Sequence, residues 1–213
     1  SAAIAPAFAQ NGLPTAPGVL SRKSDKPVDF ADLPAPRRFV TEHKGIAGGK
    51  RITWRATAGE TYVSNIHGEP VARIFSFDYV RTGPQDPSRP VLFVFNGGPG
   101  SASLWLHMGV VGPRRAVLSP EVNPRSTPPF GPVDNPDTLL DVADLVFIDP
   151  VGTGFSHAVG NASDLDFASV DVDADTAARF IELWLTRNGR WNSPKYLVGE
   201  SYGTVRAAVL TRT

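Results

Sequence analysis

The residues with the clearest chemical potential form the run Gly199-Glu-Ser-Tyr-Gly203, in which a serine stands near two flanking glycines. This G-x-S-x-G pattern is typical of a nucleophile elbow, a sharp turn between a strand and a helix that exposes the serine hydroxyl. There a base can reach the hydroxyl, and a carbonyl carbon can approach it. The apolar residues 196–198 precede the run, and a helix-compatible stretch, 204–210, follows it. This context predicts that Ser201 is a nucleophile for acyl transfer.

A second glycine-rich run, Asn96-Gly-Gly-Pro-Gly-Ser101, follows the apolar residues 91–95. Consecutive glycines allow backbone N–H groups to converge on an anion without obstruction by side chains. In enzymes with a nucleophile elbow, a loop after an upstream strand donates one N–H to the oxyanion hole. A plain Gly/Pro turn is the alternative, and a phosphate loop is disfavoured because no Gly-Lys-Ser/Thr sequence follows. We therefore expect this run to face Ser201.

Three short apolar runs could position these loops. Residues 91–95, 145–148 and 196–198 are continuous apolar segments, as expected of parallel strands that are buried on both faces. A helix fits between the last two runs, because Ser169 or Asp171 can cap its start and Asn188-Gly189 can end it. Ligands of α/β sheets bind at the carboxyl ends of the strands, so both loops are expected at the same edge of the sheet.

Upstream of these runs the pattern changes. Residues 51–56, 61–66 and 71–80 alternate apolar and polar side chains, which predicts half-buried antiparallel strands. Antiparallel strands followed by a β-α-β unit indicate the α/β class, with one domain over residues 38–213.

The N-terminal 37 residues are expected to lie outside that domain. Residues 10–37 are rich in proline, serine and charge and read as a linker. Ala7-Phe-Ala9 fits the small-residue pattern at which export signals are cleaved. The start of the chain is therefore interpreted as a signal-peptide remnant, with a disordered Ala/Pro-rich terminus as the alternative.

Composition excludes several functions. Lys+Arg and Asp+Glu both number 21, so the chain lacks the basic excess that binds nucleic acid or an anionic membrane. With no cysteine, it can form neither disulfides nor thiolate metal sites. Asp171, Asp173 and Asp175 imitate a calcium loop, but Thr176 stands where that loop requires glycine. The helix dipole explains acidic residues in a first turn, and the sequence implies no metal and no cofactor.

Three runs in order, at residues 95–101, 149–156 and 199–203, resemble the serine carboxypeptidase family, in particular its bacterial branch. The resemblance runs from about Lys50 to the end of the chain. It implies an α/β-hydrolase fold and a peptide substrate with a free C-terminus. It also implies that the enzyme is exported, and is therefore periplasmic or secreted. It also assigns site residues: the nucleophile Ser201, the oxyanion-hole N–H groups of Gly98 and Tyr202, and the substrate-carboxylate ligands Asn96, Gly97 and a protonated Glu200.

The sequence departs from the family at Val110, which stands where the family has a second carboxylate-binding glutamate. Its absence removes a proton-sharing partner of Glu200, so an esterase or acyltransferase on the same scaffold is the first alternative. A non-catalytic, truncated chain is the second. Trp105 and Met108 could line the acyl pocket, but packing in the core is the favoured interpretation. The oligomeric state is not indicated by the sequence.

In α/β-hydrolases the triad acid and histidine follow the serine in the chain. The twelve residues after Ser201 contain no Asp, Glu or His. The four histidines precede it, and each is expected at the surface or in a loop: His43, His67, His107 and His157. The sequence therefore predicts the N-terminal portion of an α/β-hydrolase, truncated after the nucleophile helix, with an incomplete sheet and little activity alone.

Overall fold

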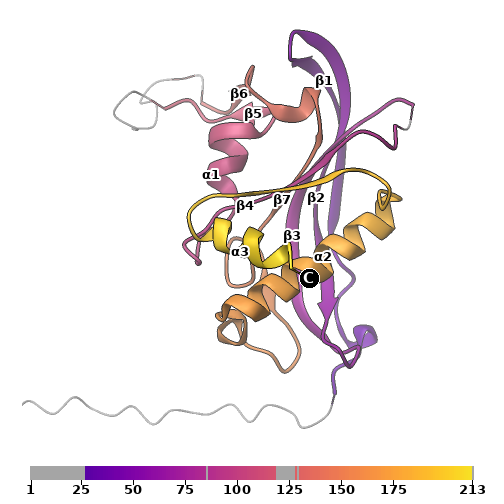
Figure 1. Ribbon diagram of the computed structural model, residues 1–213, viewed down its shortest axis with the longest axis vertical. Helices are drawn as coiled ribbons and strands as arrows, with labels where there is room; N and C mark the ends of the chain where they lie inside the picture. The colour runs from indigo at the N-terminus through magenta and orange to yellow at the C-terminus, as the bar shows by residue number, and fades with distance from the viewer. Residues whose placement is uncertain (1–26, 85, 119–127, 129, 213) are drawn as a thin grey trace, which may run out of the picture.

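The computed structural model describes residues 27–84, 86–118, 128 and 130–212. The predicted signal-peptide remnant and most of the predicted linker thus lie outside the described residues. Near the end of that linker, η1 (Phe30–Asp32) is a short 3-10 turn that Asp29 caps by accepting from the N–H of Ala31. From Arg38 onward the chain forms one mixed sheet with helices packed on it (Figure 1).

Three long strands form the antiparallel part of the sheet: β1 (Arg38–Ala47), β2 (Lys50–Ser64) and β3 (Pro70–Arg81). β2 contains the run at 51–56 and residues 61–64 of the next run, so the prediction of two separate strands there is wrong. The sequence does not predict β1. This edge strand exposes nearly all of its side chains, and it therefore lacks the one-sided apolar period that signals a strand.

The parallel strands continue the sheet: β7 (Asp144–Ile148), β4 (Val91–Phe95) and β9 (Lys195–Gly199) follow β3 in that spatial order. β7 is antiparallel to β3 and parallel to β4, and β4 is parallel to β9. All three strands predicted from apolar runs are confirmed. The chain has the predicted α/β-hydrolase fold, with antiparallel leading strands followed by a parallel β-α-β unit. The outer edge of β9 has no strand partner in the described part of the chain.

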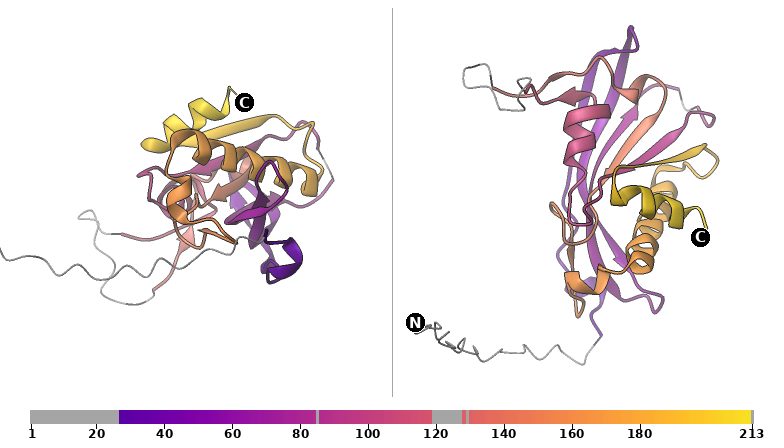
Figure 2. Two further views of the ribbon diagram at one scale, coloured as in Figure 1. Left: turned by 90° about the horizontal axis from the view of Figure 1, so that it is seen from below. Right: turned by 60° about the vertical axis from the view of Figure 1, so that its left-hand side comes forward.

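The main helices are α1 (Leu104–Leu106) with its π-helical continuation η2 (His107–Val111), α2 (Val170–Asn188) and α3 (Tyr202–Leu210). α2 and α3 cover one face of the sheet, and α1 lies on the other (Figure 2). α2 begins and ends as predicted, because the Ser169 hydroxyl accepts from its first turn and Gly189 adopts the left-handed conformation at its end.

Alternating side chains of the central strands supply a core on each face. Phe93 and Phe95 point toward α2, and the ring of Phe93 meets Trp184 edge-on at 5.5 Å. Val94 and Phe147 point to the opposite face, under α1. Because both faces of β4 and β7 are buried, their sequences are continuous apolar runs, as the sequence analysis assumed.

Short elements complete the fold: β5 (Arg114–Arg115), β6 (Val133–Asp134), η3 (Leu139–Asp141), β8 (His157–Ala158) and η4 (Asp164–Phe167). β5 pairs with β6, and β8 pairs with β3. None of the described helices has the length and apolar character needed to cross a bilayer.

Candidate active site

Ser201 lies on the turn that joins β9 to α3. Its backbone angles are φ 56° and ψ −125°, and no other non-glycine residue among those described has a positive φ. This conformation is strained for an L-residue and is found where the surrounding structure enforces it. Ser201 is exposed, and it occupies the N-cap position of α3. The N–H group of Tyr202, the first residue of that helix, and the positive end of the helix dipole therefore lie directly beside Ser201.

The glycine-rich loop lies against this turn. A Cβ added at Gly97 would lie 2.4 Å from the backbone nitrogen of Tyr202 and 2.6 Å from the carbonyl oxygen of Glu200. Only glycine allows such an approach of two backbones. The next residue, Gly98, has φ 111°, a conformation that other residues rarely adopt. The two segments predicted to form an oxyanion hole are thus in direct contact.

Asn96 connects the loop to the elbow through its buried side chain. Its Nδ2 donates to Oε2 of Glu200 at 3.2 Å, and its Oδ1 accepts from the N–H of Leu106 at 3.0 Å. Asn96 is 1% exposed, whereas Glu200 is exposed to solvent. The structure thus brings together all six predicted site residues, although their chemical roles stay predictions: Asn96, Gly97, Gly98, Glu200, Ser201 and Tyr202.

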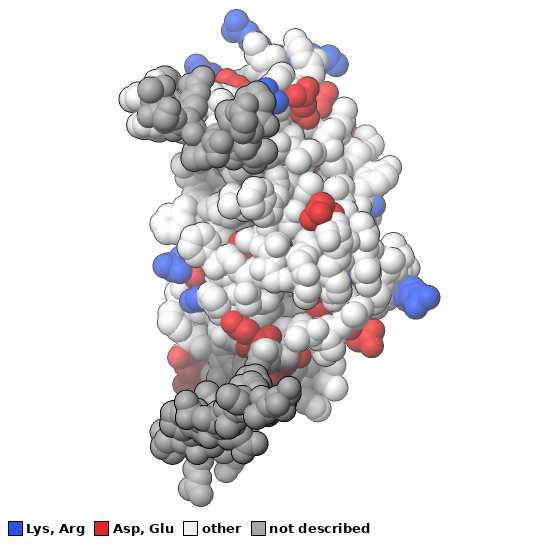
Figure 3. Space-filling model, turned by 90° about the vertical axis from the view of Figure 1, so that its left-hand side faces the viewer, with Lys and Arg blue, Asp and Glu red and all other residues white. Residues whose placement is uncertain are grey.

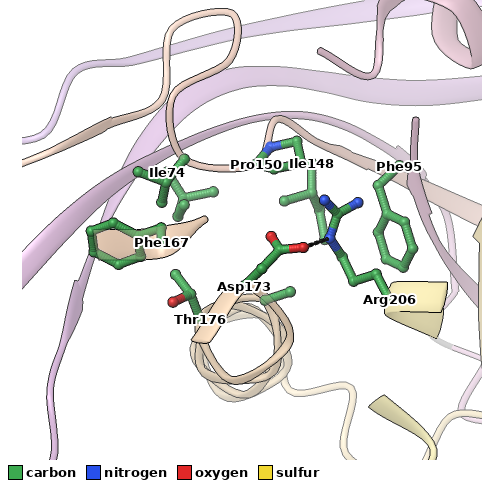
Figure 4. Close-up of a pocket in the computed structure, with 10 residues that line it drawn as sticks. Ile74, Phe95, Ile148, Pro150, Phe167, Asp173, Thr176 and Arg206 are labelled. Carbon is green, nitrogen blue, oxygen red and sulfur yellow. Dashed lines mark hydrogen bonds and ion pairs between the residues drawn. The ribbon is translucent and has the colours of Figure 1, made fainter. Parts of the chain in front are cut away.

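A buried ion pair, which the sequence analysis missed, lies beneath the elbow (Figure 4). Nε of Arg206 on α3 donates to Oδ2 of Asp173 on α2 at 2.8 Å, and its Nη1 donates to the carbonyl oxygen of Asn96 at 3.0 Å. Burial raises the pKa of Asp173 above its ordinary value, and the charge of Arg206 opposes that rise. The helix dipole alone therefore does not account for Asp173, because its side chain points inward. The signal in the sequence that could have revealed this ion pair was Arg206, which is the one charged residue in the stretch 202–210 and lies one helical turn after Tyr202.

A second buried carboxylate joins the glycine loop to the loop after β7. Oδ1 of Asp149 accepts from the N–H of Ser103 at 2.9 Å, and the carboxylate also accepts from the backbone of Phe155. The hydroxyl of Ser103 in turn donates to the carbonyl oxygen of Ile148. Burial raises the pKa of Asp149. This bracing fixes the start of α1 relative to the carboxyl end of β7.

The histidines are placed away from the nucleophile. No hydrogen bond joins Ser201 to any of the four, all of which are described. His107 contradicts the expectation of a surface or loop position: it is 5% exposed, stacks on Phe147 and shares a 2.7 Å hydrogen bond with the Tyr79 hydroxyl. Burial lowers its pKa from 6.5 to about 4. His43, His67 and His157 are exposed, as predicted.

An apolar surface adjoins the glycine loop on the face that carries α1. Leu104, Trp105 and Val110 are 56%, 65% and 53% exposed. The middle of this face is largely free of charge (Figure 3). Packing of Trp105 in the core, the favoured interpretation from sequence, is therefore wrong. Val110 is uncharged and faces solvent at the position where the family resemblance would place a carboxylate.

Comparisons with known proteins identify the family to which this sequence is similar. A sequence profile of the family described as "Serine carboxypeptidase" matches residues 65–212. Serine carboxypeptidase-like 51 of Arabidopsis thaliana is 32% identical over 124 residues, covering 56% of this chain and 24% of the relative. Serine carboxypeptidase-like 34 of Arabidopsis thaliana is 30% identical over 162 residues, covering 75% of this chain and 30% of the relative.

The chain thus spans 24–30% of the length of these two curated relatives. Both are plant proteins, and they do not test the narrower prediction of the family's bacterial branch. Among solved structures, a peroxisomal alpha-beta-hydrolase from Saccharomyces cerevisiae is similar with a TM-score of 0.40 and 11% identity. That match covers 82% of this chain and 40% of the yeast protein.

Proposed function

This chain belongs to the serine carboxypeptidase family, and we propose that the full-length protein hydrolyses C-terminal peptide bonds through an acyl-enzyme on Ser201. The observation that carries the proposal is the contact of the glycine loop with the elbow. The backbone of Gly97 passes so close to the Tyr202 nitrogen that a Cβ would approach it to 2.4 Å. An exposed, strained serine beside two converging backbone segments has the geometry that acyl transfer requires.

In the proposed reaction, the Ser201 hydroxyl attacks the carbonyl carbon of the last peptide bond while a histidine base accepts its proton. The N–H groups of Gly98 and Tyr202 stabilise the negative oxygen of the tetrahedral intermediate. The same histidine then protonates the leaving amino group, and water hydrolyses the acyl-enzyme. None of the described histidines bonds to Ser201. Since this chain spans only 24–30% of the length of its two relatives, we propose that the histidine and its acidic partner belong to the remainder of the full-length protein.

The free carboxylate of the substrate is proposed to bind Asn96, the Gly97 N–H and Glu200. Glu200 would act in its protonated form, because two carboxylates can share one site only when a proton lies between them. The hydrogen bond from Asn96 to Glu200 supports a shared site, and the exposure of Glu200 leaves it accessible to a ligand. The substrates would then be peptides with a free C-terminus, and the enzyme would act on them after its export.

An esterase or acyltransferase on the same scaffold is the second candidate. Two observations favour it: Val110 is an exposed apolar side chain, and it adjoins the similarly exposed Leu104 and Trp105. Such a surface suits an apolar acyl or alcohol group better than a carboxylate. A non-catalytic role is the third candidate for the chain alone. Without its base, the serine would retain only about 10³-fold rate enhancement over water from the oxyanion hole.

The proposal is tested by treating the full-length protein with a fluorophosphonate probe, which labels activated serines. We expect labelling that Ser201→Ala abolishes. A separate, unlabelled sample of the protein is assayed on blocked dipeptides with a free C-terminus and on simple aryl esters. Cleavage of both supports the carboxypeptidase, and cleavage of esters alone would move the assignment to the second candidate. Wild-type protein that folds but remains unlabelled would overturn the hydrolase assignment.

A further inference from the structure

Arg206 is a fully buried guanidinium on α3, 1% exposed, directly behind the nucleophile turn. Besides its bonds to Asp173 and to the carbonyl oxygen of Asn96, its Cζ lies 5.1 Å from the ring centroid of Phe95 and 5.3 Å from that of Tyr202. Figure 4 shows the guanidinium with the carboxylate of Asp173 facing it and the ring of Phe95 beside it. One side chain thus contacts residues of β4, of the glycine loop, of the elbow and of α2.

Two of these contacts lie next to the proposed oxyanion-hole donors. Asn96 directly precedes the loop residues Gly97 and Gly98, and Tyr202 itself supplies the second N–H. The two donors belong to segments that are distant in the sequence. Asn96 and Glu200, which form a hydrogen bond between these segments, are 104 residues apart. Their N–H groups act together only if these segments are held to about 0.5 Å. A charge-assisted bond from α3 to the Asn96 carbonyl is suited to that task because it is short, directional and buried.

The hydrogen bonding of Arg206 is not the arrangement expected if stability alone were its role. Its Nη2 is buried without a hydrogen-bond partner among the described residues. The neighbouring cavity, about 10 Å³, is lined mainly by apolar side chains such as Ile148 and Phe167. A buried ion pair gives little net stability compared with apolar packing of similar volume. The bonds of Arg206 to two separate segments instead fix the positions of those segments relative to each other.

We propose that Arg206, anchored by Asp173, is a positioning residue that holds the glycine loop in register with the elbow, so that the two oxyanion-hole N–H groups converge. This inference rests on the proposed hydrolase function. Arg206 does not touch the substrate in this scheme, and it acts only through the Asn96 carbonyl and the Tyr202 ring. Its loss should therefore lower kcat and the rate of serine labelling, and it should leave the KM of simple aryl esters, which lack the carboxylate that Asn96 and Gly97 would bind, largely unchanged.

The test uses Arg206→Lys in the full-length protein. Lysine keeps the positive charge, but it cannot bond Asp173 and the Asn96 carbonyl together in the planar geometry of arginine. With simple aryl esters as substrates, we expect kcat and the fluorophosphonate labelling rate to fall about 10- to 100-fold, with KM changed by less than about threefold. Asp173→Asn, which removes no heavy atom, should lower kcat about 10-fold and covers the case in which the lysine variant does not fold.

Arg190→Lys is the matched control, because Arg190 pairs with a buried aspartate, Asp144, at the opposite ends of the strands. It should lower the unfolding temperature at least as much as Arg206→Lys while kcat stays within about twofold, with each variant assayed below its own unfolding transition. Unchanged kcat in folded Arg206 and Asp173 variants, or an equal loss in the Arg190 variant, would overturn the inference alone. Unlabelled wild-type protein would overturn the proposed function and this inference with it.

Discussion

The two ends of the parallel strands hold similar residues in different arrangements. At the amino ends, Asp144 accepts from Nε of Arg89 at 2.9 Å and from Nη1 of Arg190. The remaining guanidinium nitrogens of these arginines donate to backbone carbonyls or to the Ser193 hydroxyl. At the carboxyl ends, Arg206 also pairs with a buried aspartate, but one of its nitrogens lacks a partner among the described residues.

The amino ends of the strands, with their paired charges, stabilise the sheet and are called the anchoring end. The carboxyl ends carry the candidate active site and are called the working end. Every side-chain nitrogen of Arg89 and Arg190 has a hydrogen-bond partner, and no described non-glycine residue at that end has a positive φ. The carboxyl end carries the positive φ of Ser201 and of Gly98 and an exposed hydroxyl. Strained conformations persist only where the surrounding structure over-determines them. The saturated amino end supplies that rigidity to the strands that present the site.

The largest effect is expected from removing the anchor. Asp144→Ala would leave two partly buried arginines without their buried carboxylate and should lower the free energy of unfolding by about 3–5 kcal/mol, measured by urea unfolding. The control is Asp175→Ala, which breaks an exposed i,i+4 pair with Arg179 and should change stability by less than about 0.5 kcal/mol. If both changes were equally mild, the amino-end cluster would not be an anchor.

At the working end, Gly97→Ala should damage activity more than stability. Its Cβ would push the loop away from the Tyr202 nitrogen, 2.4 Å distant, and we expect kcat/KM to fall about 10²- to 10³-fold. Gly100→Ala is the control in the same loop, because a Cβ there meets nothing within 4 Å. Its kcat/KM should remain within about twofold of wild type. A similar loss in both variants would argue for general loop distortion instead.

The stability of the sheet face that carries α1 should depend on pH, because His107 is buried there. Burial lowers the pKa of His107 to about 4, below its value of about 6.5 in the unfolded chain. The unfolded state therefore binds more protons between these values, so the contribution of His107 to stability is complete above pH 6.5 and is lost as the pH falls toward 4. The loss amounts to at most about 3 kcal/mol.

Urea unfolding of wild type and His107→Gln at pH 7 and pH 4.5 isolates this contribution. The variant should be less stable at pH 7, and the difference should narrow at pH 4.5. The exposed His67 provides the control, since His67→Gln should leave the pH dependence of unfolding unchanged. A constant difference between wild type and the His107 variant across this range would contradict the assignment of a neutral, buried imidazole.

The smallest effect concerns recognition at the working end. Glu200→Ala should raise KM about 10-fold for blocked dipeptides with a free C-terminus, because it removes one proposed ligand of their carboxylate. Hydrolysis of simple aryl esters, which lack that carboxylate, should be unaffected. Glu200→Gln offers a matched variant that keeps a donor for the carboxylate and should preserve KM at neutral pH. Equal losses on peptides and esters would place Glu200 in the general architecture of the turn.

Local sequence was sufficient for the parallel strands and for the two loops. Residues 91–95 are apolar throughout because both faces of that strand are buried, and this signal does not depend on the partner. The G-x-S-x-G run is likewise local, because the tight turn itself requires its glycines. The antiparallel part was less predictable, since β1 is exposed on both faces and carries no apolar period.

What the sequence by itself determined is the family, the order of the central strands along the chain and the identity of the proposed nucleophile, since each follows from short runs that fold locally. Only the tertiary structure decided which distant residues meet. Arg206 bonds to Asp173, which is 33 residues away in the sequence, and to the carbonyl oxygen of Asn96, which is 110 residues away. These contacts form because β4 lies beside β9 and α2 packs against α3. No local pattern encodes such neighbours, since they are set by the spatial order of the strands and by the packing of helices upon them.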